Sequence, residues 1–192
     1  PELTVGMPKM ITAGTGLDAF AHCVEAYCSP HYHPMSQGIA LEGMRLVKEY
    51  LPRAYADGTD VEARAQMMSA ATMGATAIHA LSHPSGAMYH THHGTTNAIC
   101  MPAVLQFNRP AITDLMGYAA NYLGIAGGFD GFCDYVDTLN ASLGIPRKLS
   151  GLGVENPDID RIVAGALLDP STGGNPVEMT KENTTKLLLE IV

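Results

Sequence analysis

The chain has 192 residues, a length that suits one domain of ordinary size. Its formal net charge of −8 gives an acidic surface that repels nucleic acid and anionic membranes, so we expect neither as a partner. The hydrophobic fraction of 46% supports a packed core, and the absence of a long apolar stretch argues against a membrane span.

The first half of the chain predicts helices. The opening "PELTVGMPKM" starts at a proline without a start methionine and has no basic-then-apolar leader, so we interpret it as an internal cut without an export signal. From Thr12 onward, apolar residues three and four apart predict a helix with a buried stripe of Leu17, Phe20, Ala21, Val24 and Tyr27. Pro34 precedes a second helix over 35–55, which Pro52 bends or ends, and Asp60 caps a third over 61–77.

The second half also predicts helices, over 95–108, 112–124, 132–144, 156–168 and 180–192. Thr95, Asn156 and Thr180 are the expected N-terminal caps, while Gly124 and Gly144 suit the C-terminal capping position. Alternating apolar and polar runs, which mark strands, are missing. The sequence therefore predicts an all-α, bundle-like domain of roughly eight helices.

Four cysteines occur without a C-x-x-C pair: Cys23, Cys28, Cys100 and Cys133. This spacing argues against a thiolate zinc site and against a redox motif. We expect reduced, mostly buried thiols in a cytoplasmic protein.

Five of the eight histidines lie in the segment "HALSHPSGAMYHTHHGTTNA", residues 79–98. His79 and His83 are four residues apart, and Asp18 and His22 have the same spacing on the first predicted helix. That spacing places two side chains on one helix face, one turn apart. His83 precedes Pro84, which disfavours helix, so we expect the helix to end there. His93 then stands just before a new helix.

Carboxylate and imidazole together suit a divalent metal such as Fe(II), Zn(II), Co(II) or Mn(II). Three imidazoles and one carboxylate would leave a coordination position open for a substrate oxygen. Either pair alone is common in structural roles, and their joint presence with a third histidine favours a metal site. We interpret His31 and His33 as loop residues, and His90 and His92 as solvent-facing or adjacent to the ligands.

Two longer segments resemble the metal-binding half of iron-containing, or group III, alcohol dehydrogenases. They are "MPKMITAGTGLDAFAHCVEAY" and "HALSHPSGAMYHTHHGTTNAICMPAVLQFN", and "LGIPRKL" and "DPSTGGNP" match later helices of that family. The resemblance implies an N-terminal α/β domain that binds NAD or NADP and a C-terminal all-helical domain that holds the metal. This chain resembles the C-terminal domain, with residues 1–11 as the interdomain junction and 12–192 as the metal-binding catalytic domain.

Carried over position by position, the resemblance implies the metal ligands Asp18, His22, His79 and His93. His83 matches a histidine that is not a ligand, lines the substrate and nicotinamide side and helps proton movement. The implied metal is Fe(II), with Zn(II) as the alternative. It would act as a Lewis acid on a small alcohol or aldehyde, and the alkoxide would pass a hydride to NAD or NADP. We expect the chain alone to be inactive and the intact enzyme to self-associate.

One departure from the family pattern concerns the segment before His79. Family members have a short glycine-containing turn between "ATMGATA" and "HALSH", whereas here Ile78 follows Ala77 directly. Either the turn is deleted or the numbering runs across it, and we expect the second, because deletion would move His79 relative to the first helix.

Two other protein classes remain as alternatives. Helical metal-dependent phosphohydrolases also use histidine and aspartate on helices, but their adjacent His-Asp pair is absent from this sequence. A non-catalytic helical oligomerisation module is the other alternative, and it predicts no bound metal.

Overall fold

The computed structural model describes residues 1–73 and 78–192. Every regular element within these ranges is a helix, and none is a strand, which confirms the predicted all-α class. The expected turn between Ala77 and Ile78 lies outside the described residues. The α-helices are α1 (Lys9–Cys28), α2 (Pro34–Ala56), α3 (Val61–Ala71), α4 (His79–Tyr89), α5 (His93–Tyr122), α6 (Gly128–Ser142), α7 (Ile159–Leu168) and α8 (Lys181–Ile191). Short 3-10 turns are η1 (Glu2–Thr4), η2 (Leu149–Leu152) and η3 (Pro170–Gly174).

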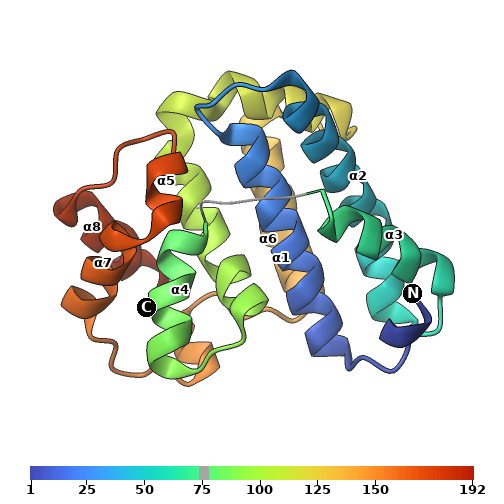
Figure 1. The fold of residues 1–192 in the computed structure, drawn as a ribbon, viewed down its shortest axis with the longest axis horizontal. Helices are drawn as coiled ribbons and strands as arrows, with labels where there is room; N and C mark the ends of the chain where they lie inside the picture. The colour runs from blue at the N-terminus through green and yellow to red at the C-terminus, as the bar shows by residue number, and fades with distance from the viewer. Residues whose placement is uncertain (74–77) are drawn as a thin grey trace.

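Helix α1 runs through the middle of the molecule and packs on both α2 and α5 (Figure 1). Helix α3 lies beside α2, α6 packs on α5, and α4 joins α7 and α8 on the opposite side (Figure 1). The predicted apolar stripe of α1 is buried throughout: Leu17, Phe20, Ala21, Val24 and Tyr27. Two polar side chains of α1, those of Asp18 and His22, lie beside the first residues of α4 and α5.

Several predicted helix ends are confirmed and others are wrong. Asp60 and Thr180 accept hydrogen bonds from the first turns of α3 and α8, and Gly124 and Gly144 adopt left-handed conformations after α5 and α6. Two predicted starts and two predicted caps need correction. Helix α1 begins at Lys9 instead of Thr12, and α6 begins at Gly128 instead of Phe132. Helix α5 is capped by His92 instead of Thr95, and α7 by Asp158 instead of Asn156. Among the described residues, none of the helices has an apolar stretch that could span a bilayer.

Helix α4 does not end before Pro84, where the sequence predicts an end, but continues to Tyr89. Helix α2 passes Pro52 and ends at Ala56, close to the predicted end at residue 55. Likewise, 95–108 and 112–124 belong to one helix, α5, which contains Pro110. Pro84 packs closely on Gly165 of α7, and the Ser85 hydroxyl donates to the Leu81 carbonyl. Tertiary packing therefore outweighs the local preference of proline.

Gly94 allows α5 to approach α1 closely enough to bring the predicted ligands together. A Cβ atom at Gly94 would collide with the Gly14 carbonyl oxygen and lie 3.0 Å from the Asp18 Cβ. We expect Gly94→Ala to lower the free energy of unfolding by about 1–3 kcal/mol, because the two helix backbones would have to separate.

Gly117 on the same helix provides a matched control for Gly94→Ala. A Cβ atom there meets nothing within 4 Å, so Gly117→Ala should be neutral or stabilising by up to about 1 kcal/mol. Urea unfolding followed by circular dichroism measures both variants. Equal stability of the two variants would contradict the close-approach role of Gly94.

Candidate metal centre

The four predicted metal ligands converge from three helices. Asp18 and His22 lie on α1, His79 begins α4 and His93 begins α5. The Asp18 Oδ1 atom lies 3.4 Å from the Nε2 atoms of both His79 and His93, and Asp18 Oδ2 lies 3.9 Å from His22 Nε2. The imidazoles of His22 and His79 stack with their centroids 4.1 Å apart. One carboxylate and three imidazoles therefore face a common centre.

The spacing of these atoms fits a small divalent cation. Ligand bonds of about 2.0–2.2 Å in a tetrahedral site imply ligand–ligand distances of roughly 3.4 Å. The Asn97 amide nitrogen, one turn after His93, lies 2.6 Å from Asp18 Oδ1 and within 3.2 Å of the Nε2 atoms of His79 and His93. Because this one nitrogen lies close to Asp18 Oδ1 and to the Nε2 atoms of His79 and His93, these three atoms face one region. The donor set suits Fe(II) and Zn(II) alike.

Glu25 holds His79 in place from the side away from that centre. Its Oε2 lies 2.9 Å from His79 Nδ1, and its Oε1 accepts from the His79 backbone N–H at 3.1 Å. Both residues are almost fully buried, with relative exposures of 4% for Glu25 and 2% for His79. A carboxylate on Nδ1 favours the tautomer that carries its proton there and leaves Nε2 free to bind a metal.

The charges of the cluster shift its protonation equilibria. For His79, burial acts to lower the pKa, but hydrogen bonds to Asp18 and Glu25 outweigh it and raise the pKa to about 9. For Asp18, burial acts to raise the pKa, and hydrogen bonds from His79 and Asn97 hold it below its usual value. Burial lowers the pKa values of His22 and His93. Because the pKa of His79 is raised, a metal cation would compete with a proton for its Nε2.

His83 lies beside the four predicted ligands and has a partner of its own. Its ring centroid is 5.3 Å from those of His79 and His93, and its Nδ1 lies 2.7 Å from Asp169 Oδ2. Burial acts to raise the pKa of Asp169, but hydrogen bonds from Ser171 and His83 keep it below its usual value. Nitrogen atoms of His79, His83 and His93 also lie within 4.8 Å of one another. His83 is thus close enough to His79 and His93 to contribute to the same site.

The remaining histidines lie outside this cluster, as their sequence positions indicate. His31 is in the loop between α1 and α2, and His33 caps α2. His92 caps α5 by accepting a hydrogen bond from the Thr95 backbone N–H, and exposed His90 ends α4 in a left-handed conformation.

Sequence reasoning missed three side chains that the structure brings to the site. Asn97 follows His93 by four residues on α5, a spacing that signals a shared helix face. Glu25 lies about two turns after Asp18 on α1. Asp169 lies in "DPSTGGNP", far from the histidines in sequence, so no spacing rule connects it to His83.

We expect Glu25→Gln to weaken metal binding by about 10–100-fold, because the neutral amide no longer fixes the His79 tautomer. The control is Glu49→Gln, which changes an exposed carboxylate on α2 and should leave the affinity unchanged. Competition with a chromogenic chelator measures both. An affinity of Glu25→Gln equal to that of the parent would show that His79 needs no such support.

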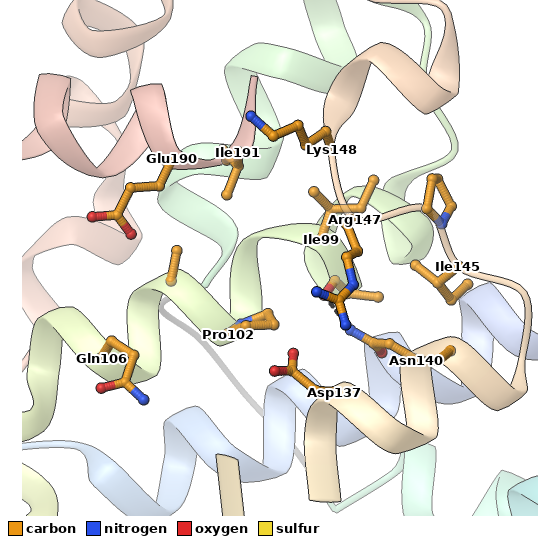
Figure 2. Close-up of a pocket in the computed structure, with 14 residues that line it drawn as sticks. Ile99, Pro102, Gln106, Asp137, Asn140, Ile145, Arg147, Lys148, Glu190 and Ile191 are labelled. Carbon is orange, nitrogen blue, oxygen red and sulfur yellow. Dashed lines mark hydrogen bonds between the residues drawn. The ribbon is translucent and has the colours of Figure 1, made fainter. Parts of the chain in front are cut away.

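A separate cavity of about 430 Å³ lies between α5, α6 and the end of α8. Figure 2 shows part of its lining: Ile99 and Pro102 from α5, Asp137 and Asn140 from α6, and Arg147 and Lys148 from the following loop. None of the four predicted metal ligands lines it. This cavity is therefore distinct from the metal centre.

The chain is similar to known proteins over nearly its whole length. Residues 12–192 match the model of the Fe-containing alcohol dehydrogenase family, C-terminal. The chain is 38% identical to 4-hydroxybutyrate dehydrogenase of Cupriavidus necator, covering 98% of this chain and 53% of that protein. It is 32% identical to NAD-dependent methanol dehydrogenase of Bacillus methanolicus, covering 98% and 53%.

Solved structures give the same result. A crystal structure of 1,3-propanediol oxidoreductase superposes with a TM-score of 0.94 at 28% identity, covering all of this chain and 54% of that one. The chain thus spans about half the length of the proteins it matches.

Proposed function

We propose that this chain, which belongs to the Fe-containing alcohol dehydrogenase family, is the metal-binding catalytic part of an NAD(P)-dependent dehydrogenase for small alcohols and aldehydes. The observation that carries the proposal is the convergence of Asp18 on the Nε2 atoms of His79 and His93, with His22 beside them. The matches described above give no support to a phosphohydrolase or to a non-catalytic helical module.

In this proposal Asp18, His22, His79 and His93 hold a divalent metal, Fe(II) in first place and Zn(II) as the alternative. A metal there would supply a Lewis acid that lowers the pKa of an alcohol hydroxyl and polarises an aldehyde carbonyl. The Asp18 carboxylate contributes the one negative charge among the four ligands, and the three neutral imidazoles preserve the electrophilic character of the site. Glu25 keeps the His79 ring oriented and its Nε2 available.

His83 is the proposed proton relay between the reacting oxygen and solvent. Its side chain is 46% exposed, whereas that of His79 is 3% exposed, so His83 reaches both the cluster and water. Asp169 holds the proton on His83 Nδ1 and leaves Nε2 as the acceptor. The hydride acceptor is NAD or NADP, bound by a part of the protein outside this chain.

An alcohol panel tests this function on the full-length protein. We expect formation of NADH or NADPH from primary alcohols and diols, and consumption of the reduced cofactor with the corresponding aldehydes. Activity should vanish after metal removal by a chelator and return with Fe(II) or Zn(II). A protein that hydrolyses phosphate esters and oxidises no alcohol would overturn the proposal.

A further inference from the structure

Asn97 of α5 is completely buried beside the proposed metal ligands, with a relative exposure of 0%. It follows His93 by four residues, so both side chains project from the same face of α5. Its Nδ2 lies 2.6 Å from Asp18 Oδ1, 3.0 Å from His79 Nε2 and 3.2 Å from His93 Nε2. The amide is therefore in direct contact with three of the four proposed ligands.

The oxygen of the same amide has no partner. Asn97 Oδ1 is buried and accepts no hydrogen bond from any of the residues that the structure describes. The reverse orientation of the amide would set this oxygen against the Asp18 carboxylate, so Nδ2 is the atom that faces the ligands. A buried acceptor without a donor lowers stability, and an apolar residue at position 97 would avoid that cost. The reason for an amide here therefore lies in its Nδ2 contacts.

Only one of the three Nδ2 contacts is compatible with a bound metal. The Nε2 atom of an imidazole that carries its proton on Nδ1 has one lone pair, which a metal would take from His79 and from His93. A carboxylate has about four lone-pair sites on its two oxygens, so Asp18 can accept from Asn97 and bind a cation at the same time. Among the described residues outside the four proposed ligands, Asn97 alone donates a side-chain hydrogen bond to Asp18.

We propose that Asn97 is a positioning residue that fixes the Asp18 carboxylate for metal binding through the hydrogen bond from Nδ2 to Oδ1. The Asp18 side chain is 27% exposed, so without this bond its carboxylate can turn toward solvent. A hydrogen-bonding partner that orients a ligand in this way strengthens metal binding. The inference rests on the proposed metal site and adds to it a residue that is not itself a ligand.

Titration of the full-length, chelator-treated protein with Co(II) tests this role, because the visible absorption of bound Co(II) depends on the number of its ligands. We expect Asn97→Ala to bind Co(II) about 10–100-fold more weakly than the parent protein does. At saturation its visible spectrum should also differ from that of the parent, because an unrestrained Asp18 carboxylate can bind through both oxygens.

Each other outcome has a definite meaning. Parent-like Co(II) affinity in folded Asn97→Ala would overturn the proposal. Weaker binding with an unchanged spectrum would also refute it, because the loss would then come from the fold and not from the orientation of Asp18. A parent protein that binds no Co(II) would remove the proposed metal site itself, and with it the role of Asn97.

Asn140→Ala is the matched control, because it removes another buried amide. Asn140 on α6 is 8% exposed, and its Nδ2 donates to the Ala98 carbonyl at 2.8 Å instead of to a proposed ligand. The control should be less stable than the parent but bind Co(II) with the parent's affinity and spectrum. Equal weakening of Co(II) binding by both alanine variants would contradict a specific role for Asn97.

Asn97→Ser decides the matter if Asn97→Ala does not fold. The serine hydroxyl is one bond shorter than the amide and does not reach Asp18 Oδ1, so this variant should also weaken Co(II) binding by about tenfold or more. Binding as tight as in the parent protein would show that Asp18 needs no bond from position 97.

Discussion

Replacement of Asp18 by alanine is expected to abolish tight metal binding by the full-length protein. Asp18 is the only carboxylate among the four proposed ligands, and its Oδ1 lies 3.4 Å from the Nε2 atoms of His79 and His93. Without it, three imidazoles would have to hold a dication with no compensating charge. The loss should exceed the roughly 10–100-fold effect of removing an outer hydrogen-bonding partner of a metal ligand. Elemental analysis of the purified variant measures the remaining metal.

The matched control for Asp18→Ala is Asp134→Ala, which removes an exposed carboxylate from α6 and should retain the full metal content. His79→Ala should lose metal as Asp18→Ala does, because both changes remove a proposed ligand. Circular dichroism distinguishes loss of metal from loss of fold. A folded Asp18→Ala protein with full metal occupancy would refute the ligand assignment.

Replacement of His83 by alanine should have the opposite pattern, with metal retained and turnover lost. A proton relay contributes about 10²–10⁴-fold to rate, so kcat should fall within that range while metal content is unchanged. This test is needed because nitrogen atoms of His79, His83 and His93 lie within 4.8 Å of one another, a geometry that also allows His83 to serve as a metal ligand. Metal analysis and steady-state kinetics on the same preparation separate the two roles.

Asp169→Asn extends this test to the partner of His83. The amide nitrogen can donate to Nδ1 and so favours the wrong imidazole tautomer, and we expect kcat to fall by about 10–100-fold. The double variant His83→Ala/Asp169→Asn should be no slower than His83→Ala alone, because both changes act through one ring. The control is His31→Ala, in the loop after α1, which should leave kcat unchanged. Additive losses would mean that Asp169 acts independently of His83, and metal loss in His83→Ala would make it a ligand.

The fold could be predicted from the sequence wherever a local pattern determines structure. The apolar stripe of α1, the caps Asp60 and Thr180 and the glycines that end α5 and α6 all follow from spacing and side-chain chemistry. Besides the starts and caps corrected above, the errors concern proline. Pro84 and Pro110 disfavour helix locally, but contacts with distant residues, such as Gly165 beneath Pro84, keep α4 and α5 continuous.

The candidate site, too, was predictable only where local spacing determines it. The four-residue spacings predicted that Asp18 would lie beside His22 and His79 beside His83, and helix geometry alone explains both. That α1, α4 and α5 meet at one point depends on tertiary packing, including the close approach of α5 to α1 at Gly94. The sequence indicated this meeting through the joint presence of the two pairs and a third histidine, and through the family resemblance. Glu25 and Asp169 become visible as partners of His79 and His83 only once distant segments are brought together.

Anomalous scattering from crystals of the full-length protein, recorded at the iron and zinc absorption edges, would locate and identify the metal. We expect one peak within about 2.0–2.2 Å of an Asp18 oxygen and of ring nitrogens of His22, His79 and His93. A peak bound by His79, His83 and His93 with Asp18 out of reach would contradict it, as would a metal bound elsewhere in the protein.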